Sequence, residues 1–128
     1  MVYIWDALRI HHVAMRTADV DRLERFYAGV LGLRVVKRDA ERGSVWLQPG
    51  GAVIMLEPLS EGEDPVRAGS MELLAFSALD RGELDVWRER LANAGVAVEA
   101  ATVHTLYFRD PDGRRIAVSD YGFPSVPA

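Results

Sequence analysis

The chain contains the same pattern twice, and this repetition restricts its possible folds more than any other feature. Residues 10–16 (IHHVAMR) form an apolar, strand-like run, and residues 71–77 (MELLAFS) form a second run of the same kind. A helical pattern follows each run and stops at a glycine, Gly32 in the first copy and Gly95 in the second. The sequence therefore predicts two copies of one structural unit.

An amphipathic helix is predicted in each copy, because apolar residues recur at helical spacing. Asp19 offers a capping oxygen at the start of the first pattern, and Asp80 stands at the start of the second. Each glycine stands where a helix would end in the left-handed conformation. The predicted helices cover residues 19–31 and 80–94.

Short β-like runs follow each helix and are separated by turn-like breaks. The predicted strands are 33–36, 44–47 and 52–56 in the first copy, and 96–98, 103–108 and 115–120 in the second. The strongest turn signal is Asp110–Gly113, in which proline fixes one backbone dihedral and glycine tolerates the conformation needed at the end of the turn. Each copy thus reads as β-α-β-β-β.

The predicted fold class is α+β, with two βαβββ modules that pair to form a half-barrel cleft with the helices outside. A single such module has a sheet with one bare face, so the second module is needed to cover it. We expect one domain over residues 8–121. Its modules span about 8–58 and 71–121, and the linker between them, 59–70, is rich in glycine, proline and charge.

Composition excludes several classes of function. The net charge is −4, with acids and bases interspersed, so no basic stripe is present to bind a nucleic acid. The chain has no cysteine, which removes thiolate nucleophiles and zinc–thiolate sites. Its apolar runs are shorter than a membrane span. A protein of the cytoplasm, without nucleic-acid or membrane partners, is expected.

Three phrases of the sequence resemble the vicinal oxygen chelate superfamily: HVAM at 12–15, FYAGVLGL at 26–33 and YFRDPDG at 107–113. This superfamily includes glyoxalase I, extradiol dioxygenases, and fosfomycin and bleomycin resistance proteins. The resemblance covers about residues 8 to 121. It implies a soluble domain with a small-molecule cleft, and it implies a homodimer.

Active members of that superfamily typically hold a divalent metal with side chains from the first and last strand of each module. The resemblance places these positions at His12, Met55, Leu73 and Ala117. Only His12 can bind a hard or borderline cation, because the other three side chains offer no oxygen or imidazole. We therefore expect no metal and no other cofactor, and an apolar cleft floor.

His12 is the first candidate for a functional role, as a general base or a hydrogen-bonding group in the cleft, although a structural role is the alternative. Glu57 follows Met55 by two residues and shares its face, so it is a candidate acid or base, or else an exposed carboxylate at a strand end. Tyr107 is the third candidate, and it shares a face with Thr105 by alternation. Both resemble substrate contacts of the fosfomycin-resistance branch.

The remaining polar and aromatic candidates have weaker assignments. Arg16 and Ser119 are expected on the cleft face, where they could orient a polar ligand or only rim the cleft. His11 is expected on the face opposite His12, against a helix, and His104 away from the cleft, both in structural or partly exposed positions. Trp46 and Trp87 are predicted in the core, with the face of Trp46 undetermined. The predicted ligand-binding residues are His12, Arg16, Met55, Glu57, Leu73, Thr105, Tyr107, Ala117 and Ser119.

The preferred hypothesis is a metal-free protein that binds a small, partly apolar molecule for resistance, sequestration or sensing. The alternative is an enzyme of isomerase, lyase or dioxygenase type that uses His12 with Glu57 or Tyr107, with or without a divalent metal. A third possibility is a subunit whose cleft is filled by its own side chains.

Overall fold

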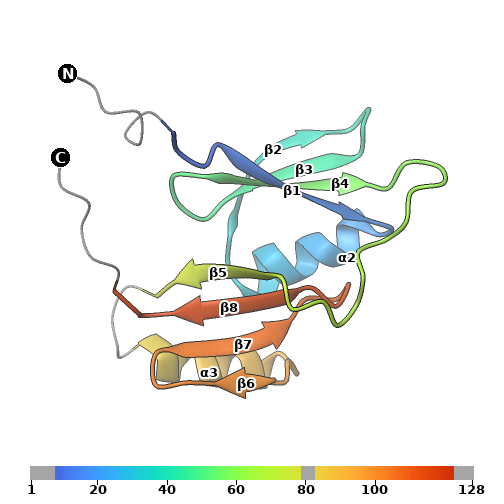
Figure 1. Cartoon of the computed structure of the whole chain (residues 1–128). Helices are drawn as coiled ribbons and strands as arrows, with labels where there is room; N and C mark the ends of the chain where they lie inside the picture. Colours follow the sequence, from blue (N-terminus) through green and yellow to red (C-terminus); the bar gives the residue numbers. More distant parts are fainter. Residues whose placement is uncertain (1–7, 79–82, 123–128) are drawn as a thin grey trace. The chain divides into compact units, whose positions relative to one another are not determined.

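The computed structural model describes residues 8–78 and 83–122, and it divides the chain between Val66 and Arg67 into two compact units. The boundary falls inside the segment 59–70 that the sequence suggests as a linker. Each unit runs through a strand, a helix and three further strands (Figure 1). The two βαβββ modules predicted from the repeat are therefore confirmed, and their pairing into a cleft stays a prediction.

The first unit is an open sheet of four strands with the order β1-β4-β3-β2. β1 is parallel to β4, and the other pairs are antiparallel. Its elements are β1 (His12–Thr17), the α-helix α2 (Val20–Glu24), its π-helical continuation η1 (Arg25–Val30), β2 (Arg34–Asp39), β3 (Ser44–Gln48) and β4 (Val53–Pro58).

The second unit repeats this topology with the strand order β5-β8-β7-β6, and β5 is parallel to β8. Its elements are β5 (Leu73–Ser77), the α-helix α3 (Glu83–Asn93), β6 (Ala100–Ala101), β7 (Thr105–Arg109) and β8 (Arg115–Ser119). Among the described residues, no helix is both long and apolar enough to cross a bilayer.

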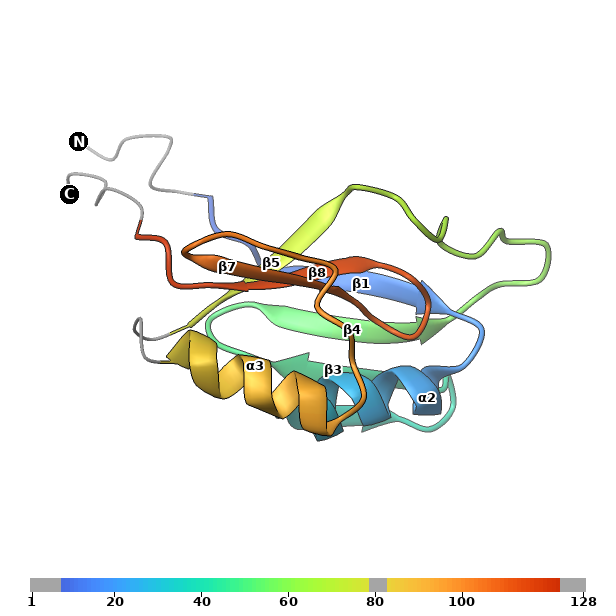
Figure 2. The same cartoon turned by 90° about the horizontal axis from the view of Figure 1, so that it is seen from below.

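One face of each sheet carries a helix, and the core of each unit lies between them (Figure 2). α2 packs against β3 and β4, and α3 packs against β7 and β8. On β4 every second side chain is buried, as Ile54 and Leu56 show, and on β8 three consecutive residues, Ile116–Val118, are buried. The opposite face of each sheet is the one on which binding residues are expected.

The first helix begins as predicted, with the Asp19 carboxylate accepting a hydrogen bond from the Arg22 backbone N–H at 3.0 Å. It widens to a π-helix from Arg25, which the apolar spacing does not indicate. Gly32 ends it with φ 77°, the left-handed conformation that favours glycine. The predicted start of the second helix, at Asp80, lies outside the described residues.

The strand predicted at 96–98 is wrong. The backbone N–H of Val96 bonds back to the Leu91 carbonyl at 2.9 Å and completes the end of α3. Pairing with β7 begins only where the Glu99 N–H bonds to the Tyr107 carbonyl at 2.7 Å, and β6 itself is Ala100–Ala101. The alternating side chains of residues 96–98 therefore belong to an extended connection.

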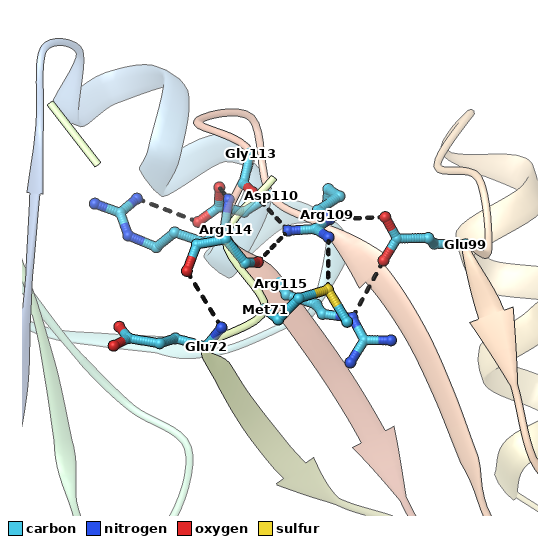
Figure 3. A network of polar contacts seen from close by, with 9 residues as sticks. Met71, Glu72, Glu99, Arg109, Asp110, Gly113, Arg114 and Arg115 are labelled. Carbon is cyan, nitrogen blue, oxygen red and sulfur yellow. Dashed lines mark hydrogen bonds and ion pairs between the residues drawn. The ribbon is translucent and has the colours of Figure 1, made fainter. Parts of the chain in front are cut away.

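The turn predicted at Asp110–Gly113 is confirmed, and the Gly113 N–H bonds to the Asp110 carbonyl at 2.9 Å. The buried Asp110 carboxylate accepts hydrogen bonds from the backbone N–H groups of Asp112 and Arg114, at 2.9 and 3.0 Å. Beside the turn, Arg109 donates to Glu99 and to the Gly113 carbonyl (Figure 3). These contacts fix the β7–β8 connection.

Candidate functional site

The face of the first sheet that points away from α2 carries four of the predicted site residues. On β1 and β4 the buried positions alternate with half-buried and exposed ones, and His12, Arg16, Met55 and Glu57 occupy the latter. In the strand register His12 lies opposite Val53, and Arg16 lies opposite Glu57. The four side chains thus share one face, as strand alternation predicts.

A hollow of about 330 Å³ lies on this face. Trp46 on β3 pairs with Met55 on β4 in the register, and both line the hollow. Trp46 is half-buried, so its predicted place in the core is wrong. The lining residues are His11, His12, Val36, Lys37, Trp46, Val53 and Met55.

Two adjacent histidines form one side of the hollow. The Nδ1 atoms of His11 and His12 are 2.9 Å apart, so one ring donates a hydrogen bond and the other accepts it. The predicted position of His11 on the opposite face, against a helix, is wrong. β1 begins only at His12, and the alternation of a strand does not extend to the residue before it.

A break in the pairing of β2 turns a lysine toward the same hollow. Val35 pairs with Leu47 and Lys37 pairs with Trp46, so Val36 is an extra residue in β2, a β-bulge. The Lys37 ammonium lies 4.0 Å from the centre of the Trp46 ring. This contact is a cation–π interaction, and it places a positive charge at the hollow.

The indole Nε1 of Trp46 is buried and has no hydrogen-bond partner among the residues that the structure describes. A buried donor without an acceptor costs roughly 1–3 kcal/mol, so such groups are uncommon in folded proteins. This donor lies on the buried part of the Trp46 ring, whereas the surface that Trp46 gives to the hollow is apolar.

Glu57 is held by an arginine. Arg16 Nη1 bonds to the Glu57 carboxylate at 2.5 Å, and its Nε and Nη2 bond to Glu63, the latter at 2.7 Å. Hydrogen bonds from Arg16 and from the Ser60 backbone lower the pKa of Glu63 to about 2, and the bonds to Glu63 and Glu57 raise the pKa of Arg16 above its ordinary value. Arg16 thus ties β1 to β4 and to the loop that follows it.

His12 and Glu57 do not form a proton-transfer pair in this structure. Val53 is the partner of His12 in the register, and Glu57 lies four residues further along β4. At about 3.3 Å per residue, this is a separation of roughly 13 Å along the strand. Two groups that exchange a proton directly must lie within hydrogen-bond distance of each other. His12 and Glu57 therefore do not support the enzyme hypothesis as a pair.

The second sheet places the other predicted residues together on the face away from α3. Thr105, Tyr107, Ala117 and Ser119 occupy alternate positions on β7 and β8, and Tyr107 pairs with Ala117. Thr105 and Ala117 are themselves buried. The hydroxyl oxygens of Thr105 and Ser119 are 2.8 Å apart, so these two groups bond to each other. Arg115 lies 4.2 Å from the centre of the Tyr107 ring. Leu73, on β5 opposite Arg115, is 44% exposed.

His104 occupies a structural position, as the sequence indicates. Its Nδ1 lies 2.7 Å from the carboxylate of Asp120, whose side chain is 3% exposed. The ring also meets Tyr121 edge to face, with the centroids 5.7 Å apart. The contact between His104 and Asp120 links the residue before β7 to the residue after β8.

The metal positions of the resembled superfamily do not fit a divalent cation in this chain. The first sheet supplies one imidazole and one thioether, from His12 and Met55, and the second supplies the hydrocarbon side chains of Leu73 and Ala117. His11 adds an imidazole, which still leaves fewer than the three protein ligands of a usual catalytic zinc site. Within residues 8–78 and 83–122, no three His, Asp or Glu side chains cluster as a metal site would require.

Comparisons with known proteins agree with the fold. A family model described as Glyoxalase/Bleomycin resistance protein/Dioxygenase superfamily matches residues 9–118. The chain is 28% identical over 124 residues to MhqE of Bacillus subtilis (strain 168), named as a presumed ring-cleaving dioxygenase; the match covers 87% of this chain and 41% of that protein.

Solved structures give the same result. A Vibrio pseudocholerae protein from the mobile metagenome (VPC_CASS1) superposes with a TM-score of 0.72 at 29% identity, covering 96% of this chain and 99% of the other. A lactoylglutathione lyase from Agrobacterium tumefaciens superposes with a TM-score of 0.70 at 25% identity, covering 87% and 92%.

Proposed function

Because the chain belongs to the glyoxalase/bleomycin resistance protein/dioxygenase superfamily, we propose that it binds a small, partly apolar molecule in the hollow of its first sheet, without the divalent metal of that superfamily. One observation carries this proposal. The hollow measures about 330 Å³ and is lined by indole, thioether, valine and imidazole side chains. Small-molecule sites are usually concave and mostly apolar, with a few polar groups.

The names of the relatives support a small organic ligand. MhqE is named for ring cleavage and the Agrobacterium protein for lactoylglutathione, so both names refer to small organic molecules. This chain spans 41% of MhqE, so the activity of that longer protein is not transferred to it. Only the use of this fold for a small-molecule site is carried over.

The chemistry of the metal positions supports binding without the family metal. Thioether, isobutyl and methyl groups stand at Met55, Leu73 and Ala117, and none of them is a ligand that zinc, manganese or iron(II) prefers. We therefore expect protein purified without chelator to contain no stoichiometric divalent metal. About one such ion per chain in elemental analysis, lost in His12→Ala, would contradict this.

Tryptophan fluorescence tests the proposal, because Trp46 lines the hollow and Trp87 lies on α3. A panel of small molecules should include a dihydroxybenzene, lactoylglutathione, and neutral and anionic single-ring compounds. We expect at least one to change the emission saturably, with the change lost in Trp46→Phe and kept in Trp87→Phe. If no member of the panel does so, the hollow is not a binding site for these classes.

A further inference from the structure

We propose that the hollow selects an anion with a flat apolar body, of the aromatic carboxylate class, and that Lys37 is the residue that makes this selection. The inference rests on the proposed function, since it names the ligand class of the same site. It is carried by the Lys37 ammonium beside the hollow and by the bulge that brings Lys37 there.

The side chains around the hollow are unbalanced in charge. They include one lysine, Lys37, and no aspartate or glutamate. The whole protein has the opposite balance, with 19 acidic residues against 15 lysines and arginines. The surface of the hollow itself is apolar, so the Lys37 ammonium beside it is the charge that favours an anionic ligand.

Lys37 points to the hollow because of the bulge. In a regular β2, Val36 would take the place opposite Trp46, and Lys37 would be directed to the face that α2 covers. The extra residue shifts the register by one, so Lys37 pairs with Trp46 and both Val36 and Lys37 line the hollow. Bulges commonly re-aim a side chain in this way.

The charge of Lys37 is also free to meet a ligand. The neighbouring Arg38 is paired with the Glu24 carboxylate, at 2.5 and 3.0 Å, and Arg16 is paired with Glu57 and Glu63. No carboxylate of the described residues lies within ion-pair distance of the Lys37 ammonium, which sits over the Trp46 ring. An ammonium held over an indole offers a ligand a charge and an aromatic surface together.

The size of the hollow limits the body of the ligand. A volume of about 330 Å³ is near the lower end of the range for ligand pockets, which suits a compound of one or two rings. Trp46, Met55, Val53 and Val36 supply the apolar surface for such a ring. The carboxylate would lie toward the Lys37 ammonium, beside this apolar surface.

Matched pairs of probes test the inference. Benzoate and 2-naphthoate are titrated beside their neutral amides, benzamide and 2-naphthamide, while the Trp46 indole N–H resonance is followed by NMR and assigned with Trp46→Phe. We expect each carboxylate to bind roughly threefold or more tightly than its amide at low salt, and the difference to shrink as salt is added.

Two variants of Lys37 separate charge from packing. Lys37→Met keeps a long apolar stem and should remove the preference for the carboxylate, and Lys37→Arg should keep it. Equal affinity of carboxylate and amide in the parent protein, or an unchanged preference in Lys37→Met, would overturn the inference while leaving the hollow a binding site. If neither probe nor any compound of the fluorescence panel perturbs Trp46, the proposed function itself fails.

Discussion

The residues that line the hollow include two that lie where a regular strand begins or breaks. His11 precedes β1, and Lys37 follows the extra residue of β2. Their side chains join His12 and Trp46 around an apolar hollow, and the Lys37 ammonium lies beside it, over the Trp46 ring. The selectivity of the site is therefore a property of individual side chains on a common scaffold.

Variants of two histidines test whether a side chain that lines the hollow acts in binding and not in folding. His12 is exposed and lines the hollow, so His12→Ala should weaken ligand binding and leave the melting temperature near that of the parent protein. His104→Ala should lower stability and leave ligand binding unchanged. It leaves the buried Asp120 carboxylate without its partner, which we expect to cost about 1–3 kcal/mol of stability, with the Trp46 response unchanged.

Unfolding by heat or denaturant measures stability, and the fluorescence titration measures ligand binding. If His12→Ala lowers stability as much as His104→Ala and leaves ligand binding intact, His12 has a structural role.

At the scale of elements, the loop after β4 is held by an ion pair with a defined pH dependence. The pKa of Glu63 falls from its ordinary value of 4.5 to about 2, chiefly through its hydrogen bonds from Arg16. A lowered pKa means that the folded state favours the charged form. The contribution is thus fully present above about pH 4.5, and it is lost as the pH falls from there to about 2.

Glu63→Gln should therefore flatten the fall in melting temperature between about pH 4.5 and pH 2. Glu61→Gln is a matched control in the same loop, because Glu61 is exposed and the described residues offer it no ion pair. Parallel curves for the parent protein and Glu63→Gln in this window would show that the ion pair adds nothing to folding.

The turn between β7 and β8 gives a second prediction at this scale. Gly113 has φ 88°, and a Cβ at this position would lie 2.9 Å from the Cβ of Ala68. Gly113→Ala should destabilise the protein by about 1 kcal/mol or more, from both backbone strain and the clash. Gly29→Ala is the control, since a Cβ there meets nothing within 4 Å.

The double variant Gly113→Ala/Ala68→Gly should recover only part of the loss. It removes the contact at 2.9 Å, but the Cα of residue 68 still lies 3.1 Å from the added Cβ, and φ stays strained. Urea unfolding measures the stability of Gly113→Ala, Gly29→Ala and the double variant. A stability of Gly113→Ala within error of the parent protein would show that this conformation does not require glycine.

The sequence predicts the ends of elements well where single residues mark them. Examples are the helix start at Asp19, the helix end at Gly32 and the turn from Asp110. It fails at 96–98, because alternation marks an extended segment and cannot show where pairing begins. The facing of His12, Met55 and Tyr107 follows from period-two alternation. That rule cannot place His11 outside the strand or Lys37 after a bulge, and it could not settle the face of Trp46.

At the scale of the whole molecule, we propose a homodimer. Several apolar side chains of the described residues are exposed, including Ile10 at 70%, Met71 at 66% and Val103 at 82%. β1 and β5 are also edge strands of their sheets, and such edges are commonly covered by a partner. Light scattering at working concentration should give about twice the mass of the chain; a monomer mass would refute the proposal.

Chemical-shift mapping of chelator-treated protein, with the ligand that gives the strongest fluorescence response, tests whether the hollow binds a small molecule without metal. We predict chemical-shift changes at Val36, Lys37, Trp46 and Val53 without added metal. The changes should be small on the buried face, at Leu47 and Leu56. Shifts that arise only after a divalent metal is supplied, or that fall away from the hollow, would contradict it.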